Sequence, residues 1–252
     1  MQLSVTIITL NEEKTIARAI ASVAFADEVI VIDAGSCDQT REIAVRLGAR
    51  VYQEPWQGYG QQKNKAQRRA QGVWVLNIDA DEVVSEVLAQ EIQAAMHSDC
   101  VGFSLPRRTY MGKKWIAHGG WYPNYLVRLA RRELSQWTEP AVHESLEVQG
   151  QIGRLLSPLD HYGFSGFASQ VETNLRFARL GAQDLARRGA RGGITLLLLK
   201  PLGKFIETYI LKRGFLDGLA GFIIAVNASY SMFLKYAFLL EERALWYADS
   251  DS

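Results

Sequence analysis

The sequence predicts an α/β fold, a mostly parallel sheet flanked by helices, with an α-helical extension at its C-terminal end. In the first hundred residues, short β-branched runs alternate with stretches of helical character. Strands separated by helices of about 10–15 residues form parallel βαβ units. From Gly166 onward the sequence has helical character, interrupted by glycines and by Pro201. We therefore expect a sheet domain over residues 1–165 and a helical extension over residues 166–252.

Each element of the first part has its own signal. Val5–Thr9 is a β-branched run typical of a buried strand. Asn11 is a residue type that caps helices, and Glu12 and Glu13 would favour the helix dipole in the first turn. Right-handed crossovers place the C-terminal ends of parallel strands on one edge of the sheet, where ligands bind. The alternation runs through helix Glu13–Val23, strand Glu28–Ile32, helix Asp38–Leu47, strand Ala49–Gln53, helix Gln61–Gln71, strand Val73–Ile78 and helix Ser85–His97.

The elements after residue 100 are less regular. Cys100–Leu105 has the pattern of a strand, and Ala141–Val148 has the pattern of another. Between them, Arg107–Pro140 is aromatic and basic and contains Gly119-Gly120. The chain shows no internal repeat and no low-complexity linker.

The composition is that of a folded protein without general affinity for nucleic acid. Apolar residues make up 48% of the chain and charged residues 22%, which excludes long disorder. Lys and Arg number 28 against 27 Asp and Glu, so the net charge of +1 lacks the basic excess of a nucleic-acid binder. Cys37 and Cys100 have no metal-ligand or redox spacing, as expected in a reducing compartment. The first residues lack the basic segment of a signal peptide, so we expect a cytoplasmic protein.

Two basic segments and one apolar stretch favour an anionic partner or a membrane surface. Arg107–Arg132 holds seven bases and no acid, and Glu172–Arg213 holds nine bases and three acids. Such charged segments commonly form nothing more than a solvent-exposed face. Gly218–Leu234 is uncharged over 17 residues, just short of the roughly 20 that a spanning helix needs. A spanning helix, an interfacial amphipathic region and a buried core or homo-oligomer contact all remain open.

Acidic residues follow two of the expected strands. Asp79, Asp81 and Glu82 come directly after one buried strand, and Asp33 ends another in a glycine turn. The carboxylates of the first group suit Mg²⁺ or Mn²⁺, which commonly bridge to diphosphate oxygens. The Asp33 carboxylate could accept from a base N–H or a ribose hydroxyl. Taken alone, the first group equally fits an acidic helix start, and Asp33 equally fits a turn residue that bonds its own backbone.

With both groups of acids in place, four motifs resemble those of family 2 glycosyltransferases, whose GT-A fold is Rossmann-like. No GxGxxG follows the first strand, which argues against a dinucleotide dehydrogenase. The motifs occur in the family's order, each at the expected element: Thr9-Leu10-Asn11-Glu12, Asp33-Ala34-Gly35-Ser36-Cys37-Asp38-Gln39-Thr40, Lys63-Asn64-Lys65-Ala66 and Asp79-Ala80-Asp81-Glu82.

The resemblance implies a nucleotide-binding set. Thr9 and Asn11 match the loop that lines the nucleotide base, and Asp33 matches the acid that contacts uridine. Lys63 stands where the family has a basic residue near the nucleotide. Ala34 stands where many members of the family have a second acid, so the resemblance assigns a role to Asp33 and none to a second acid.

The resemblance also implies a metal site and a catalytic base. Asp79 and Asp81 match the DxD pair that meets the nucleotide and a divalent cation, Mg²⁺ or Mn²⁺, and the second acid is the usual metal contact. His161 matches a histidine that binds metal or diphosphate in many GT-A enzymes, although a lone histidine is more often structural. Glu144 matches the base of inverting enzymes, which must reach the acceptor hydroxyl. The alternative for Glu144 is an exposed glutamate at a strand end.

Trp121, Tyr122 and Arg128 resemble an acceptor site. Aromatic faces suit the C–H surfaces of sugars, and an arginine can hold a phosphate or carboxylate through two hydrogen bonds. The alternative is a set of ordinary core aromatics with a surface arginine.

Within the family the chain resembles, over nearly its whole length, the small β-1,4-glucosyltransferases of lipopolysaccharide inner-core assembly. The resemblance implies inverting transfer of a hexose, with glucose from UDP-glucose expected, to a lipid-linked core sugar at the inner membrane face. The basic and apolar C-terminal part suits such an anionic acceptor and a peripheral position on the membrane. Two alternatives are a family 2 enzyme that uses a polyprenyl-phosphate or other cell-envelope acceptor, and a non-catalytic membrane-surface scaffold.

Overall fold

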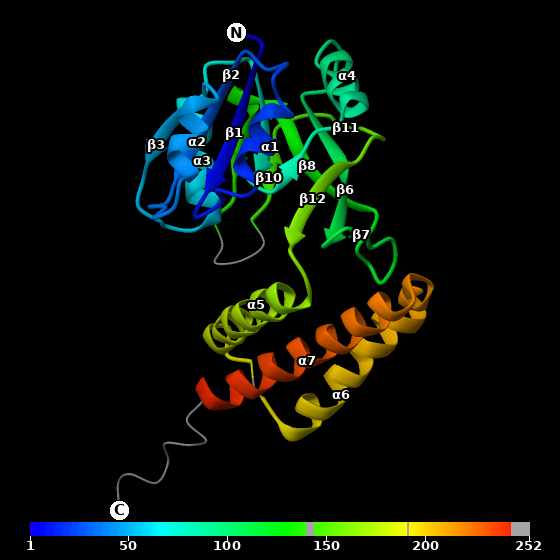
Figure 1. The fold of residues 1–252 in the computed structure, drawn as a ribbon. Helices are drawn as coiled ribbons and strands as arrows, with labels where there is room; N and C mark the ends of the chain where they lie inside the picture. The colour runs from blue at the N-terminus through cyan, green and yellow to red at the C-terminus, as the bar shows by residue number, and fades with distance from the viewer. Residues whose placement is uncertain (140–143, 191, 243–252) are drawn as a thin grey trace, which may run out of the picture. The chain divides into compact units, whose positions relative to one another are not determined.

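The computed structural model describes residues 1–139, 144–190 and 192–242. The chain divides into two compact units (Figure 1). The first unit joins Met1–Thr109 to Pro123–Gly163, and the second joins Tyr110–Tyr122 to the residues from Phe164 onward. The predicted α/β class is confirmed by the first unit, and the predicted helical C-terminal part by the second.

A mixed, mostly parallel sheet forms the body of the first unit. Strands β1 to β4 run parallel to one another, and β8 runs antiparallel to both β4 and β6. The order across the sheet is β3-β2-β1-β4-β8-β6-β12-β5, and β11 pairs with β6. The strands are β1 (Leu3–Thr9), β2 (Glu28–Asp33), β3 (Arg50–Gln53), β4 (Trp74–Asp79), β5 (Glu82–Val83), β6 (Gly102–Met111), β8 (Asn124–Arg131), β11 (Ile152–Arg154) and β12 (Leu159–Phe164). A 3₁₀ turn, η1 (Arg132–Leu134), leads to β9 (Ser135–Trp137), which pairs with β10 (Leu146–Val148) as a separate two-stranded sheet.

Helices cover both faces of the sheet because alternate residues of a strand point to opposite sides. On one face, Val5 and Ile7 pack with side chains from three of the helices, α1, α2 and α4. On the other face, Ile8 and Ile32 pack against Ala66 of α3. The helices of this unit are α1 (Ile16–Ala21), α2 (Thr40–Arg46), α3 (Tyr59–Arg69) and α4 (Glu86–Ala95). The carboxyl ends of β1, β2 and β4 are thereby left at one edge.

The local structure differs from the sequence-based expectation at two places. The helix after β1 begins at Ile16, and Asn11 does not cap it. Asn11 instead has a φ of 57° and accepts a hydrogen bond from the loop after β2, so the prediction of a cap was wrong. The strand expected at Ala141–Val148 lies partly outside the described residues, and its described part includes β10.

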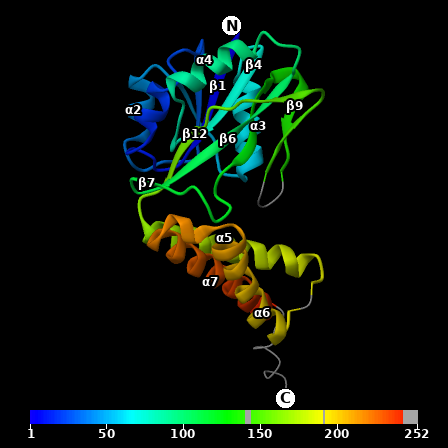
Figure 2. The same cartoon turned by 90° about the vertical axis from the view of Figure 1, so that its right-hand side faces the viewer.

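The second unit is helical, and Figure 2 shows its long helices from a second direction. Helix α7 packs against both α5 and α6. A Cβ on Gly221 of α7 would overlap the carbonyl oxygen of Gly214, so only glycine allows this close approach to the preceding turn. The elements are β7 (Lys114–Trp115), α5 (Phe167–Arg187), α6 (Ile194–Phe205), the π-helical turn η2 (Ile206–Leu211), the 3₁₀ turn η3 (Gly214–Asp217) and α7 (Leu219–Glu242).

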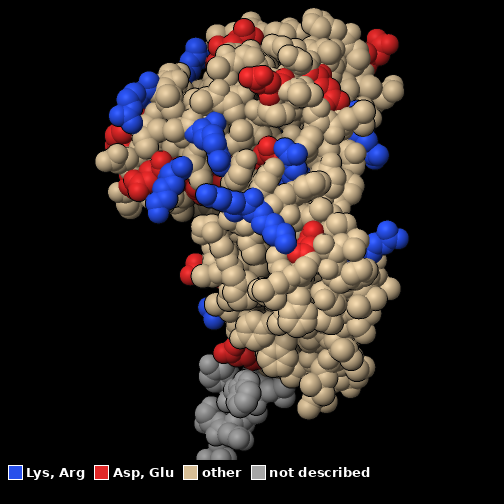
Figure 3. All heavy atoms as spheres, turned by 45° about the vertical axis from the view of Figure 1, so that its right-hand side comes forward, with Lys and Arg blue, Asp and Glu red and all other residues tan. Residues whose placement is uncertain are grey.

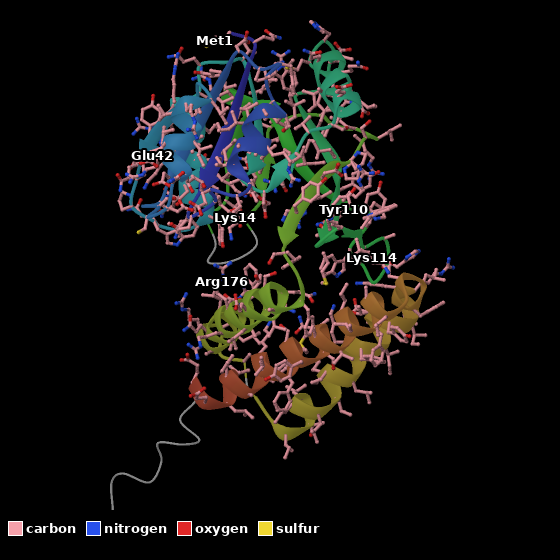
Figure 4. All side chains as sticks on the ribbon, in the orientation of Figure 1. Met1, Lys14, Glu42, Tyr110, Lys114 and Arg176 are labelled. Atoms are coloured by element: carbon pink, nitrogen blue, oxygen red, sulfur yellow. The ribbon has the colours of Figure 1, made fainter. Side chains whose placement is uncertain are left out.

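The loop after β6 is anchored to the turn before α7. Lys114, labelled in Figure 4, donates from Nζ to the carbonyl oxygen of Asp217 at 2.7 Å. The Asp217 carboxylate accepts from the backbone N–H of His118 at 2.9 Å and lies 3.1 Å from its Nδ1. These contacts hold the Gly119-Gly120 loop within the second unit.

Candidate active site

The loops after β1 and β2 lie side by side at the carboxyl edge of the sheet. Thr9 pairs in register with Asp33. Asn11 joins the two loops, because its Oδ1 accepts from the Cys37 N–H at 2.8 Å and its own N–H donates to Ser36 Oγ at 2.9 Å. Thr9 Oγ1 is buried without a hydrogen-bond partner among the described residues. This edge therefore keeps unused hydrogen-bonding capacity where a polar ligand would lie.

Asp33 is completely buried and orders its own turn. Its Oδ1 accepts from the N–H groups of Gly35 at 3.1 Å and Ser36 at 2.9 Å, and its Oδ2 accepts from the Ser36 hydroxyl. Arg41 Nε lies 3.8 Å from Oδ1. The turn that the residue types predict is present, and contact with uridine stays a prediction.

Asp79 lies at the centre of an ion-pair network. Its Oδ2 is 2.9 Å from NH2 of Arg128, and its Oδ1 is 3.4 Å from Nζ of Lys63. Arg128 is 3% exposed and also donates to Asn77 at 2.8 Å and Glu82 at 3.1 Å. Burial by itself would raise the pKa of Asp79, but Arg128 and Lys63 outweigh burial and hold that pKa well below its usual range. Asp79 is therefore ionised at neutral pH.

Lys63 connects this network to Glu144. Its Nζ donates to Glu144 Oε1 at 2.7 Å and lies 4.6 Å from the centroid of the Trp137 ring. The Lys63 side chain is 4% exposed and that of Glu144 is 16% exposed. Lys63 of helix α3 and Glu144 of the segment before β10 are 81 residues apart in the sequence. The fold thus brings an ammonium and a carboxylate to the same place as Asp79.

Asp81 and His161 form a second pair. Oδ2 of Asp81 lies 3.3 Å from Nε2 of His161, and the two side chains are 22% and 13% exposed. They meet because β12 pairs with β5, with His161 opposite Glu82. On the other side of the ring, Thr109 Oγ1 lies 3.2 Å from Nδ1 of His161.

The space beside this pair suits a small cation. A Cβ on Gly163 would overlap His161 Nε2 and lie 3.2 Å from Asp81 Oδ2, so glycine leaves that space open. Among the described residues, no group of three or more His, Cys, Asp or Glu side chains is arranged to hold a metal. One carboxylate and one imidazole fit Mg²⁺ or Mn²⁺ if the remaining ligands come from water or a diphosphate.

Comparison with known proteins identifies the family. Residues 4–146, more than half of the chain, match the profile of the family described as "Glycosyl transferase family 2". The chain belongs to glycosyltransferase family 2.

Relatives of this glycosyltransferase align over nearly its whole length. An uncharacterized glycosyltransferase of Rickettsia typhi is 32% identical and aligns with 95% of this chain and 87% of its own length. The lipopolysaccharide core biosynthesis glycosyltransferase LpsC of Rhizobium meliloti is 29% identical and aligns with 97% of this chain and 94% of its own length.

A solved structure shows the same fold. It is glucosyl-3-phosphoglycerate synthase from Mycobacterium tuberculosis, in complex with Mn²⁺, UDP and glucosyl-3-phosphoglycerate. The TM-score is 0.52 and the identity 21%, and the match covers 75% of this chain and 81% of that chain. The first unit of the glycosyltransferase therefore has the GT-A fold that the motifs imply.

The acceptor residues expected in this glycosyltransferase fall into different units. Trp121 and Tyr122 belong to the second unit, where their rings contact Phe164 at 5.5 Å and Trp115 at 5.4 Å between centroids. Arg128 belongs to the first unit, where both terminal nitrogens of its guanidinium already donate to neighbours. Contact of all three with an acceptor stays a prediction.

Several contacts of the site were not expected from the sequence. Glu82 is completely buried, accepts from the Asp79 N–H at 2.8 Å and pairs with Arg128. Asp160, next to His161, receives two hydrogen bonds from Arg108, at 2.5 and 2.9 Å. The absence of any acid between Arg107 and Arg132 is a signal in the sequence, because those bases need partners elsewhere in the fold.

Glu12 adds negative charge to the site of the glycosyltransferase. Burial raises the pKa of Glu12, a hydrogen bond from Thr15 opposes the rise, and Asp81 and Asp79 add to it. Carboxylates that repel one another in this way form a place where a cation is favoured.

Proposed function

We propose that this enzyme transfers a hexose, with glucose expected, from a UDP-sugar to an inner-core sugar of a lipopolysaccharide-type glycolipid, with inversion at the anomeric carbon. The observation that carries the proposal is the first-unit edge where the ion-paired Asp79, Lys63 and Glu144 occur together with the pair Asp81 and His161. The name of the Rhizobium meliloti relative supports the acceptor class. The synthase complex, whose fold is shared, supports a UDP-sugar and a divalent cation.

In this proposal the loops after β1 and β2 bind the nucleotide. The buried Thr9 hydroxyl, which lacks a partner among the described residues, donates to the base or ribose. Asn11 and Asp33 keep both loops in one arrangement through their backbone hydrogen bonds. Preorganised loops reduce the entropy lost on binding.

Asp81 and His161 are assigned to the cation. Both oxygens of Asp79 already face cationic side chains, so Asp79 joins the metal ligands only with a change in those contacts. Asp81 and His161 would hold a divalent cation, which would supply positive charge to neutralise the departing diphosphate. Lys63 supplies a further positive charge at the same edge.

Glu144 is assigned the role of catalytic base. Its carboxylate accepts the proton of the acceptor hydroxyl while the oxygen attacks the anomeric carbon and the bond to the diphosphate breaks. The contact with Lys63 fixes one carboxylate oxygen and leaves the other to take that proton.

The second unit is assigned to the inner membrane surface. Large apolar side chains are exposed along α6, its turns and α7, and Figure 3 shows a face of this unit with few charged groups. The same segment carries Lys200, Lys212 and Arg213, which suit anionic headgroups. The most exposed of these apolar side chains are Ile194 (73%), Leu198 (61%), Leu211 (73%) and Leu219 (74%).

Calorimetric titration of the full chain tests the donor site. UDP, UDP-glucose, UDP-galactose and UDP-N-acetylglucosamine are titrated with Mn²⁺ and again with EDTA. We expect binding that requires Mn²⁺ and is lost in Asp81→Ala. A folded protein that binds none of them in either condition would favour a non-catalytic scaffold and overturn the proposal.

An acceptor assay separates the two enzymatic alternatives. UDP-glucose turnover is measured with a phosphorylated inner-core glycolipid and, separately, with a polyprenyl phosphate. Transfer to the first supports the proposal, and transfer only to the second would replace its acceptor.

A further inference from the structure

A cavity of about 250 Å³ that opens to the surface lies in the second unit. Its wall combines side chains from α5, the end of α6, α7 and the loop that carries the Gly119-Gly120 pair. The wall residues used below are Trp121, Gln170, Phe177, Lys204, Met232 and Lys235. Typical small-molecule pockets measure about 300–1,000 Å³, so this cavity suits a single sugar ring better than a whole nucleotide sugar.

Two of the wall residues have unused polar capacity. Gln170 is 3% exposed, and its Oε1 is buried without a donor among the described residues. Lys235 lies along α5 with its Nζ about 3.3 Å from where a Cβ on Gly181 would be, and the ion pairs of the described second-unit residues do not include it. A buried amide oxygen without a donor is destabilising. A ligand with a hydroxyl and an anionic group would satisfy both residues.

The other cation at the wall is already partly neutralised. Lys204 pairs with Glu207 at 3.1 Å, and Glu207 also pairs with Lys212 at 2.5 Å. Lys235 is therefore the cation most available to a ligand anion, and Lys204 adds a weaker field from α6.

The remaining wall is apolar and aromatic. The Trp121 ring is held against Phe164, with 5.5 Å between centroids, and Phe177 and Met232 complete the wall. The C–H face of a sugar packs well on an aromatic ring that is already fixed in place.

We propose that this cavity binds one anionic sugar unit, a hexose-sized ring that carries a phosphate or a carboxylate. Lys235 pairs with the anion, Trp121 packs against the ring, and Gln170 accepts from a ring hydroxyl. The inference rests on the proposed function for the source of that unit, a charged sugar of the glycolipid acceptor. A free sugar phosphate has the same chemistry and is the other source.

The test is calorimetric titration of the full chain, in EDTA and without donor, with glucose 6-phosphate, glucuronate, glucose and inorganic phosphate. We expect the two anionic sugars to bind at least tenfold more tightly than either glucose or phosphate. Lys235→Gln should weaken both anionic sugars about tenfold or more, whereas the matched control Lys200→Gln, on exposed α6 surface, should change neither. Trp121→Leu should weaken the sugars and leave inorganic phosphate unchanged.

Three results overturn the proposal: no binding of either anionic sugar, equal affinities in the wild type and in Lys235→Gln, or phosphate binding as tightly as glucose 6-phosphate. Circular dichroism of each variant confirms that it is folded. UDP is titrated with Mn²⁺ on the same preparation, so a protein that binds UDP but no anionic sugar loses only the cavity proposal. A detergent-solubilised phosphorylated glycolipid that displaces glucose 6-phosphate identifies the acceptor as the source, and a failure to displace it assigns the cavity to a free sugar phosphate.

Discussion

Replacing Glu144 by glutamine exchanges one carboxylate oxygen for an amide nitrogen, and the resulting amide cannot act as a base. In Glu144→Gln the amide oxygen still accepts from Lys63 at the position of Oε1, so the local packing is kept. General-base catalysis contributes about 10²–10⁴-fold to rate. We therefore expect kcat to fall by about that factor, with the affinity for UDP and Mn²⁺ unchanged. Steady-state kinetics and calorimetry on the same preparation measure both quantities.

The control for this prediction is Glu147→Gln, which makes the same change on the neighbouring strand β10 at an exposed position. Its turnover should equal that of the wild type. Turnover of Glu144→Gln near the wild-type rate would show that the base is another residue.

Thr109 contacts the imidazole of His161, one of the proposed metal ligands. With a cation on Nε2, as proposed, His161 would carry its proton on Nδ1 and would donate it to Thr109 Oγ1, which lies 3.2 Å away. In Thr109→Val the imidazole loses that acceptor. Loss of such an outer partner costs about 10–100-fold in metal affinity, so we expect the Mn²⁺ concentration for half-maximal activity to rise by that factor.

A titration of activity against Mn²⁺ measures this shift, and kcat at saturating Mn²⁺ should stay close to the wild-type value. Thr109→Ser, which keeps the hydroxyl, should restore the wild-type titration. An unchanged titration in Thr109→Val would remove His161 from the proposed metal ligands.

At the scale of elements, one ion-pair network joins strands β4 and β8 to helix α3 through Asp79, Arg128 and Lys63. Arg128→Met keeps similar bulk but leaves Glu82 and Asp79 without their main partner. Removing one member of a buried ion pair costs about 3–5 kcal/mol. We expect the free energy of unfolding in urea to fall by about that amount, whereas the exposed control Arg46→Met should stay within about 0.5 kcal/mol.

The difference in stability between the wild type and Arg128→Met should depend on pH, and the direction of that dependence follows from the pKa of Asp79. The pKa of Asp79 in the folded chain is held below its ordinary value of 3.8. Its contribution to stability is thus complete above about pH 4 and is lost as the pH falls further. The stability difference between the wild type and Arg128→Met should therefore be constant from about pH 7 to 5 and shrink below about pH 4. A difference that grows on acidification would contradict the assignment of this network.

The elements that the sequence predicts best are those whose apolar pattern is unbroken. The β-branched runs of β1, β2 and β4 show no charged interior residue, and these strands form where expected. Strands β8 and β12 were not predicted because each contains a charged side chain that its partner makes compatible with burial. Buried Arg128 forms ion pairs with Asp79 and Glu82, and buried Asp160 forms an ion pair with Arg108.

The same limit applies to the site. The motifs predict which residue types occur at the carboxyl edge, because parallel strands end there. They do not predict that Lys63 meets Glu144 or that Asp81 meets His161, since these contacts depend on the packing of α3 and on the register of β12 against β5. Sequence order contains no direct signal of such a register.

At the scale of the whole molecule, the sheet unit and the helical unit have different surfaces. The helical unit exposes leucine, isoleucine and phenylalanine side chains along α6 and α7, where a helix of 24 residues is long and apolar enough to span a membrane. At 1.5 Å per residue that helix is about 36 Å long, against about 30 Å of hydrocarbon. Length alone therefore does not separate a spanning helix from one that lies on the surface.

For the proposed membrane association, packing favours a surface position of α7 over a spanning one. Ile224, Ala225 and Asn227 of α7 are buried inside the helical unit. Asn227 Nδ2 has no hydrogen-bond partner among the described residues. A spanning α7 would leave its packing partners and expose that amide to lipid, at a cost of several kcal/mol. A helical unit that keeps its packing and lays its exposed leucines into the headgroup region avoids this cost.

The surface position makes a prediction for the full chain and lipid vesicles. Sedimentation should show binding to vesicles that contain anionic phosphatidylglycerol, weaker binding to neutral phosphatidylcholine vesicles, and release by high salt, because the basic residues act through screened charges. Leu219→Glu should reduce binding at least tenfold, since burial of a leucine side chain contributes about 1.5–3 kcal/mol. The matched control Leu156→Glu, equally exposed at 74% but in the sheet unit, should bind vesicles as the wild type does. Protein that stays with the vesicles in both high salt and alkaline carbonate would instead indicate that α7 spans the bilayer. These treatments release proteins that lie on the membrane surface, and they do not release a helix that crosses the hydrocarbon core.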